Sequence, residues 1–246
     1  MLADPADQRT LLTLADLDSE VARVQHTARS LPQHKTIADL MAARQQVTDE
    51  LIYAVTEVDD LQVAVAKAEA DLAPVRARLE RDERRIADGS VSDGKVLRSL
   101  QDEVEHLKRR ISDLEDDELE FMGKLEEAAA HRDRLAARKA EIESRLREEV
   151  AARDQQVARL SQEAKDLSVT RAPVAARIPA PLLALYEKYR ASSGLGAAAL
   201  KAGRCSGCQL QLNVSDLDTY RRAPANQVLR CVECERILVR TAESGL

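Results

Sequence analysis

The fold is decided by Cys205-Ser206-Gly207-Cys208 and Cys231-Val232-Glu233-Cys234, which contain the only four cysteines of the chain. A gap of 22 residues separates the two Cys-x-x-Cys pairs. Two residues between the cysteines of a pair let one tight turn direct both sulfurs toward a single ion. Two such turns facing each other give a closed tetrahedral site of four thiolates, the geometry of a structural zinc site. The sequence therefore predicts one structural Zn²⁺, held by Cys205, Cys208, Cys231 and Cys234.

Other interpretations of the cysteines stay open. Two disulfides suit a secreted chain, but Met1-Leu2-Ala3-Asp4 begins no signal sequence. A redox pair in a thioredoxin-like fold needs a strand-helix-strand pattern, and none surrounds either pair. Four thiolates and one Zn²⁺ leave a charge of −2, which three neighbouring cations are expected to offset in part: Arg204, Arg230 and Arg236. The four histidines are interpreted as solvated helix residues rather than ligands: His26, His34, His106 and His131.

The composition favours long helices over a large globular core. Aromatic residues make up 2% of the chain and charged residues 33%, with one Phe and no Trp. No apolar run approaches the roughly 18 residues of a membrane span, so we expect a soluble, cytoplasmic protein. Residues 1–172 carry 27 Lys and Arg against 37 Asp and Glu, a net charge of −10, whereas residues 173–246 carry 10 against 6, a net charge of +4. This mild basic excess is weaker than the patch expected of a dedicated nucleic-acid binder.

A coiled-coil seam with one central turn predicts a helical hairpin. Apolar residues recur in alternating steps of three and four from Leu14 to Leu167. The stretch Asp88–Gly94 is the one clear turn in this region, and Asp93 is placed to cap the helix that follows. Because arms of about equal length flank the turn, we predict an antiparallel hairpin within one chain. The alternative is two chains that pair in parallel, with the turn as a local interruption.

Prolines mark the expected helix ends. Asp4-Pro5 indicates a capping residue followed by proline at the first helical position. Pro32 predicts a break near residues 30–32, where Ser30 also fits a capping box for a second helix. Pro74 is expected to bend its helix without ending it, because the seam continues beyond it. Together, Ala172-Pro173 and Ile178-Pro179-Ala180-Pro181 are expected to end the last long helix and open a new one.

Residues 173–246 are typical of a short helix followed by a zinc ribbon. An apolar face at Leu182–Tyr189 predicts the helix. Strands are expected at residues 195–201, 209–214, 227–230 and 237–239, with a second short helix capped by Ser215. So small a core would depend on its metal for folding. The predicted fold class is mainly α: a kinked antiparallel helical-hairpin stalk over residues 1–172, then a small zinc-ribbon β domain with its short helix over 173–246.

Several motifs beyond the cysteine pairs point to a known family. They are Leu185-Tyr186-Glu187-Lys188-Tyr189-Arg190, the Gly194-Leu195-Gly196 turn, Lys95–Glu103 and Leu114–Glu118. With them the chain resembles the bacterial coiled-coil proteins that end in a four-cysteine zinc ribbon. The resemblance implies a kinked helical hairpin with a zinc-ribbon head, acting as a nucleic-acid- or protein-binding adaptor, and some members are linked to RNA and to flagellar gene expression. Val232 and Glu235 depart from the family pattern, because Pro and Gly often hold those places.

Two functional hypotheses follow, and an enzyme is not expected. The first is a non-enzymatic adaptor whose ribbon binds nucleic acid, with RNA favoured over DNA. Its candidate phosphate contacts are Lys201, Arg204, Arg221, Arg222, Arg230, Arg236 and Arg240. The second is a protein-binding scaffold or chaperone-like protein that acts through the coiled coil. Zinc held by four cysteines has no open position for catalysis, and no motif predicts a membrane or small-molecule partner. Redox sensing by zinc release is a further possibility.

Overall fold

The structure, a computed structural model, describes all 246 residues and divides into two compact units. The hairpin unit comprises residues 35–150, and the head unit comprises residues 1–34 together with 151–246. Three long helices make up most of the chain: α1 (Pro5–Arg29), α2 (Pro32–Ala87) and α3 (Gly94–Ala176). The sequence-based domain boundary at residue 172 stays a prediction.

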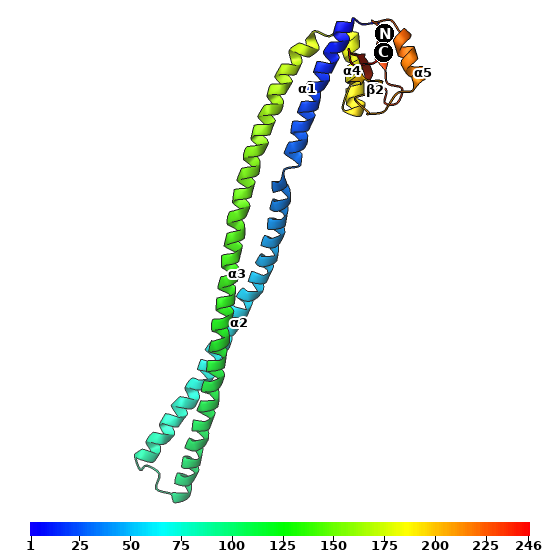
Figure 1. The fold of residues 1–246 in the computed structure, drawn as a ribbon. Helices are drawn as coiled ribbons and strands as arrows, with labels where there is room; N and C mark the ends of the chain where they lie inside the picture. The colour runs from blue at the N-terminus through cyan, green and yellow to red at the C-terminus, as the bar shows by residue number, and fades with distance from the viewer. The chain divides into compact units, whose positions relative to one another are not determined.

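In the hairpin unit, α2 and α3 lie side by side as the antiparallel arms of one chain (Figure 1). The arms pack through small apolar clusters, which are Val47 and Ala54 with Leu135, and Leu72 with Ile111 and Leu114. The turn between the arms spans residues 88–93, and the Asp93 carboxylate accepts the Lys95 backbone N–H at 2.7 Å. The predicted hairpin within one chain is therefore confirmed, and the alternative of two parallel chains is wrong.

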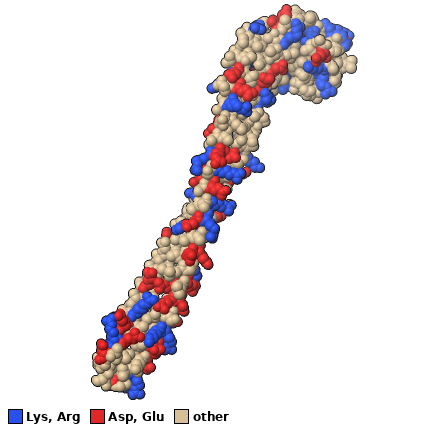
Figure 2. All heavy atoms as spheres, turned by 60° about the vertical axis from the view of Figure 1, so that its left-hand side comes forward, with Lys and Arg blue, Asp and Glu red and all other residues tan.

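Ion pairs between the arms reinforce the hairpin near its turn. Arg76 pairs with Glu115 at 2.6 Å and Arg78 with Glu103 at 2.8 Å. Figure 2 shows acidic and basic side chains intermingled along the helices. Exposed pairs of this kind contribute at most about 1 kcal/mol each, so the buried seam carries most of the stability.

The observed helix ends agree with some of the predictions made from prolines and capping residues and differ from others. Asp4 caps α1, and α2 continues through Pro74 to Ala87, both as expected. Ser30 does not begin α2, since its hydroxyl donates back to the His26 carbonyl at 2.9 Å and so closes the end of α1. The change of helix predicted at Ala172-Pro173 and Ile178–Pro181 is confirmed, although Pro173 itself lies inside α3, which runs on to Ala176 before α4 (Ala180–Ser193) begins. The last turn of α3 stays helical because Val174 and Ala175 pack against the hydrophobic core of the head unit.

The head unit is built on a four-stranded sheet. Its elements are α4 (Ala180–Ser193), β1 (Ala197–Lys201), β2 (Arg204–Cys205), α5 (Val214–Arg222), β3 (Leu229–Arg230) and β4 (Ile237–Arg240). The strand order is β2-β1-β4-β3, with β1 and β4 parallel and both outer pairs antiparallel. The last strand in the sequence therefore lies in the interior of the sheet.

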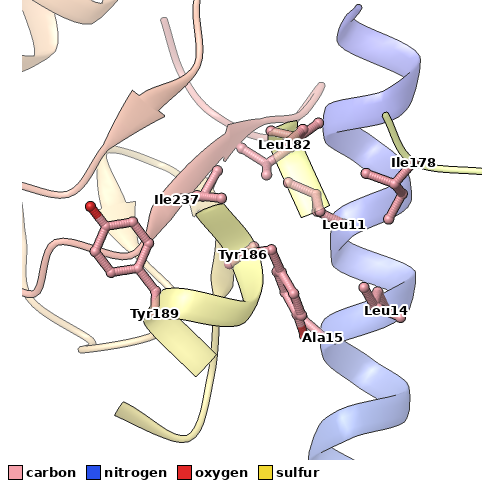
Figure 3. Close-up of a cluster of buried hydrophobic side chains, with 10 residues drawn as sticks. Leu11, Leu14, Ala15, Ile178, Leu182, Tyr186, Tyr189 and Ile237 are labelled. Carbon is pink, nitrogen blue, oxygen red and sulfur yellow. The ribbon is translucent and has the colours of Figure 1, made fainter. Parts of the chain in front are cut away.

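The two faces of this sheet serve different partners. On one face, Ile237 and Ala197 pack against α1 and α4, where Leu11, Leu14 and Tyr186 are fully buried (Figure 3). On the other face, alternate residues of the same strands, namely Ala198, Leu200 and Leu238, pack against the cysteines and against Tyr220 of α5. A side-chain period of two explains this division, since neighbours along a strand point to opposite faces.

Two predicted details of the ribbon are wrong. Residues 209–214 form no strand, only a single bridge between Gln211 and Arg204, because the chain turns sharply at Gln209, where φ is +63°. The helix α5 is capped by Asn213 rather than Ser215, and the Asn213 side chain accepts the Asp216 backbone N–H at 2.8 Å.

Backbone pairing also ties the N-terminal residues to the segment that leads into β3. Leu2 forms an antiparallel bridge with Gln227, and the Ala3 N–H donates to the Asn226 carbonyl at 2.8 Å.

Between β1 and β2 the chain reverses through Ala202 and Gly203, which have φ values of +47° and +74°. Two consecutive positive φ values fit a type I′ hairpin turn, which favours Asn-Gly rather than Ala-Gly.

Candidate metal centre and basic surface

The fold brings the four cysteines together on one face of the sheet, because Cys205 ends β2 and Cys231 directly follows β3. Their Sγ atoms all lie within 4.8 Å of one another, and the pairs Cys205–Cys234 and Cys208–Cys231 are each 3.9 Å apart. The thiols are free, which excludes the two disulfides considered from the sequence. Cys205 and Cys231 are buried, whereas Cys208 and Cys234 are half-buried. No histidine joins the cluster, so four sulfurs form a set that could hold one metal ion.

The two knuckles repeat one backbone arrangement. After the first pair, the Gln209 N–H donates to the Cys205 carbonyl at 2.8 Å, and after the second, the Glu235 N–H donates to the Cys231 carbonyl at 2.9 Å. Gln209 and Glu235 both have φ of +63°. This left-handed region costs a residue with a side chain about 1–2 kcal/mol and favours glycine. Glu235 therefore adopts a backbone conformation that favours glycine, and the second knuckle keeps the same turn and hydrogen bond as the first with Val232 and Glu235 in place.

The thiols differ in how readily they ionise. Burial raises the pKa of Cys205, and it raises the pKa of Cys231 to about 12. Burial also opposes ionisation of Cys234, but hydrogen bonds from the backbone and side chain of Arg236 help to lower the pKa of this thiol. A metal that binds all four sulfurs must therefore displace protons from the two buried thiols.

The predicted phosphate contacts fall into two groups. The arginines of the first group bind backbone carbonyls or an aromatic ring within the head unit. Arg240 donates to five backbone carbonyls between Tyr220 and Gln227, and desolvation lowers its pKa. Arg236 donates to the carbonyls of Ser193 and Leu195, each at 3.1 Å. Arg230 lies over the ring of Tyr189, with 4.9 Å between the guanidinium carbon and the ring centroid. These three arginines hold loops and the second knuckle in place.

The second group is exposed around the β1–β2 turn and α5. Lys201 and Arg204 are paired across this turn, and Lys201 forms an exposed ion pair with Glu243 at 3.1 Å. Arg221 and Arg222 both pair with Asp218 on α5. The helix lies against the turn, because a Cβ atom at Gly203 would meet the Leu217 side chain at 3.1 Å. The four cations therefore belong to adjoining elements, and Figure 2 shows Lys and Arg side chains gathered on the head unit.

A buried charge cluster that the sequence did not reveal joins three helices of the head unit. Asp18 of α1 is 5% exposed, and its carboxylate accepts hydrogen bonds from Arg171 of α3 at 2.7 and 3.1 Å. It also accepts the hydroxyl of Tyr186 from α4 at 2.7 Å and a bond from Arg190 at 3.3 Å. Glu187 completes the cluster by binding both arginines.

The charges of this cluster stabilise one another. The hydrogen bond to Asp18 is the main cause that raises the pKa of Arg171. Burial, with the negative charge of Asp18 in addition, raises the pKa of Tyr186. Burial alone would raise the pKa of Glu187, but hydrogen bonds from Arg171 and Arg190 outweigh it and lower that pKa. In sequence, these residues have the same appearance as ordinary helix charges, and only the packing of α4 on α1 distinguishes them.

Comparison with known proteins decides the family. The family model described as the CT398-like coiled coil hairpin domain matches residues 14–194. The chain belongs to this family. Among its relatives, the uncharacterised proteins Rv2229c and MT2288 of two Mycobacterium tuberculosis strains are each 32% identical over 240 residues, covering 98% of both chains. The uncharacterised protein ML1638 of Mycobacterium leprae is 29% identical and covers 83% of this chain and 88% of its own.

Solved structures of the family share the fold. A structure from Mycobacterium smegmatis is 34% identical, with a TM-score of 0.85, and the match covers 98% of this chain and all of that one. CT398 from Chlamydia trachomatis is 16% identical with a TM-score of 0.69, covering 96% and 98% of the two chains. The predicted family, a coiled coil with a four-cysteine zinc-ribbon-like head, is confirmed. None of the helices combines the length and the apolar composition that a membrane span requires.

Proposed function

We propose that this protein is a non-enzymatic, zinc-binding adaptor whose head unit binds nucleic acid. The metal part of the proposal rests on the sulfur geometry. In a tetrahedral site with Zn–S bonds of about 2.3 Å, neighbouring sulfurs are about 3.8 Å apart. Two of the S–S separations here are 3.9 Å and none exceeds 4.8 Å, so the four sulfurs fit zinc with little movement. Zinc bound in this way would be structural, since four protein ligands leave no position for water or substrate.

The nucleic-acid part is carried by the four exposed cations around the β1–β2 turn and α5. Lys201, Arg221 and Arg222 have exposed side chains, and their carboxylate partners Glu243 and Asp218 are also solvent-accessible. Such surface pairs contribute at most about 1 kcal/mol, so a phosphate group can replace the carboxylate at little cost. Each phosphate contact also releases counterions from the nucleic acid, which favours binding at low salt.

The exposure and bonding of these side chains narrow the set of seven predicted phosphate contacts. Arg204, with an exposed side chain that makes one bond to the Gln209 carbonyl at 3.0 Å, joins the four-cation surface. Arg236 and Arg240 are assigned to the scaffold instead, because each donates to two or more backbone carbonyls. Arg230 is assigned there because it lies over the Tyr189 ring and pairs with Glu235, although its side chain is exposed. RNA is placed before DNA on the family resemblance alone, and the experiment compares both.

The test is binding of labelled single-stranded RNA to the intact protein over a salt series. Arg221→Glu/Arg222→Glu is expected to weaken binding and to reduce the slope of log K against log salt by about 0.7 for each lost phosphate contact. Arg145→Glu/Arg147→Glu reverses two exposed charges on α3 and serves as the matched control. Equal losses in both variants, or no binding at low salt, would remove the nucleic-acid proposal. A single-stranded DNA of the same sequence measures the preference for RNA.

A scaffold that binds proteins through the coiled coil is the second candidate. It is favoured by several large apolar side chains that α2 leaves in solvent, among them Ile52, Tyr53 and Val63. A helix in a stable hairpin ordinarily directs such side chains toward its partner.

A further inference from the structure

The hairpin unit contains a groove of about 770 Å³ between α2 and α3. Its apolar lining includes Tyr53, Leu61 and Ala128, and its acidic lining comprises Glu57, Asp60 and Glu127. The volume lies within the range of roughly 300–1,000 Å³ that ligand-sized sites occupy. The lining comes from both arms of the hairpin, so its shape is set by the packing of two helices rather than by a loop.

Tyr53 makes this groove different from an ordinary coiled-coil surface. It is 77% exposed, whereas the other three tyrosines, Tyr186, Tyr189 and Tyr220, are all buried. The neighbouring Ile52 and Val55 are exposed as well. An exposed aromatic side chain beside aliphatic ones is the usual anchor of a protein interface, because it offers much apolar area for little loss of side-chain entropy.

The charge around the groove selects the partner. Residues 49–71 of α2 hold seven Asp and Glu and one Lys. Glu57, Asp60 and Glu127 form no ion pair within the chain, in contrast to the arms near the turn, where acidic side chains are neutralised by Arg76 and Arg78. On the α3 side, Lys124 is already paired with Glu120, which leaves Arg134 as the uncompensated cation. The groove is therefore apolar inside and carries a net negative rim.

We propose that this groove is the docking site for a basic amphipathic helix of a partner protein. The apolar face of that helix would cover Tyr53 and reach Leu61, and its Lys and Arg side chains would pair with Glu57, Asp60 and Glu127. This is helix-in-groove recognition, with apolar anchors at i, i+3, i+4 and i+7. A second copy of this chain fits less well, since it would bring two acidic segments of α2 together.

The inference rests on the second candidate function, and its test is separate from the RNA experiment. The probe is a labelled synthetic helix with Leu at positions i, i+3, i+4 and i+7 and Lys elsewhere. A scrambled peptide of the same composition has the same charge but no apolar face. Fluorescence anisotropy should show that the intact protein binds the amphipathic peptide at least about tenfold more tightly than the scrambled one. Arg221→Glu/Arg222→Glu should leave this binding unchanged.

Variants locate the site. Tyr53→Ala should weaken peptide binding by about tenfold or more, while its helical circular dichroism stays that of the wild type, because the side chain is exposed. Glu57→Lys/Asp60→Lys should weaken it to a similar degree, whereas the matched control Asp116→Lys/Asp117→Lys, outside the groove lining, should not. Equal binding of the scrambled peptide, no effect of Tyr53→Ala, or equal losses in the two charge variants would overturn the proposal. If light scattering shows that the wild type is a dimer and that Tyr53→Ala is a monomer, the groove would be assigned to a second copy of the chain instead.

Discussion

Replacing Asp18 by Ala tests whether the buried charge cluster holds α1, α3 and α4 together. Asp18→Ala deprives the fully buried hydroxyl of Tyr186 of its acceptor and removes one of the two carboxylates bound to Arg171. Removing one partner of a buried ion pair costs about 3–5 kcal/mol. Because Glu187 still neutralises Arg171 and is partly exposed, we expect the lower end, about 3 kcal/mol.

Hydrogen exchange measured by mass spectrometry is the assay, because it reports on α4 without averaging over the hairpin unit. A loss of about 3 kcal/mol corresponds to a decrease of roughly a hundredfold in the protection of α4 amides. Asp16→Ala, which removes an exposed carboxylate two residues away, should leave this protection unchanged. Tyr186→Phe should cost about 1.5–3 kcal/mol alone and much less in the Asp18→Ala background. Protection within about threefold of wild type in Asp18→Ala would refute a stabilising role for the cluster.

Three further predictions concern the ribbon and its pH dependence. Cys208→Ser should lower the zinc content well below one ion per chain and increase exchange across the sheet, and full metal content in the variant would contradict a four-thiolate site. Ala202→Asn should raise the stability of the head unit by up to about 1 kcal/mol, because Asn-Gly suits the type I′ turn. Ala202→Val should lower this stability. Thermal melts that reverse this order would contradict the assignment of a type I′ turn at Ala202-Gly203. Because the pKa of Glu187 is lowered in the folded state, its contribution is present above the ordinary value of 4.5 and is lost as pH falls through the folded value. Protection factors of α4 should therefore decrease in acid, and Glu187→Gln should flatten this dependence.

Local signals in the sequence were sufficient to predict the helical hairpin and the four-cysteine site. The Gly and Asp residues of 88–94 mark the turn because few other residues suit its backbone. The seam is recognisable because helical packing imposes a period that survives over many turns. The Cys-x-x-Cys spacing identifies all four sulfurs, since the knuckle turn fixes their separation wherever it occurs.

Features that depend on packing between residues far apart in the chain could not be predicted from the sequence. Asp18 and Tyr186 are 168 residues apart, and nothing in the local pattern of α1 distinguishes Asp18 from its exposed neighbours. Arg236 and Arg240 were grouped with the surface cations because composition gives charge but not the carbonyls that a guanidinium meets after folding. The prolines from 173 to 181 indicated where α3 gives way to α4, but the last turn of α3 extends past Pro173 because the residues that follow it pack against the core.

The position of β4 constrains the order in which a ribosome can complete this molecule. Of the four strands of the sheet, β4 is synthesised last, but β1 and β3 pair with it and not with each other. The helical hairpin closes through contacts made early and can fold while the chain is still emerging. The sheet must wait for residues 237–240, so until then Leu11 and Leu14 of the nascent chain lack part of the surface that buries them. A chain cut short before β4 would keep its coiled coil yet present apolar surface and unpaired strand edges, the features that chaperones and proteases recognise.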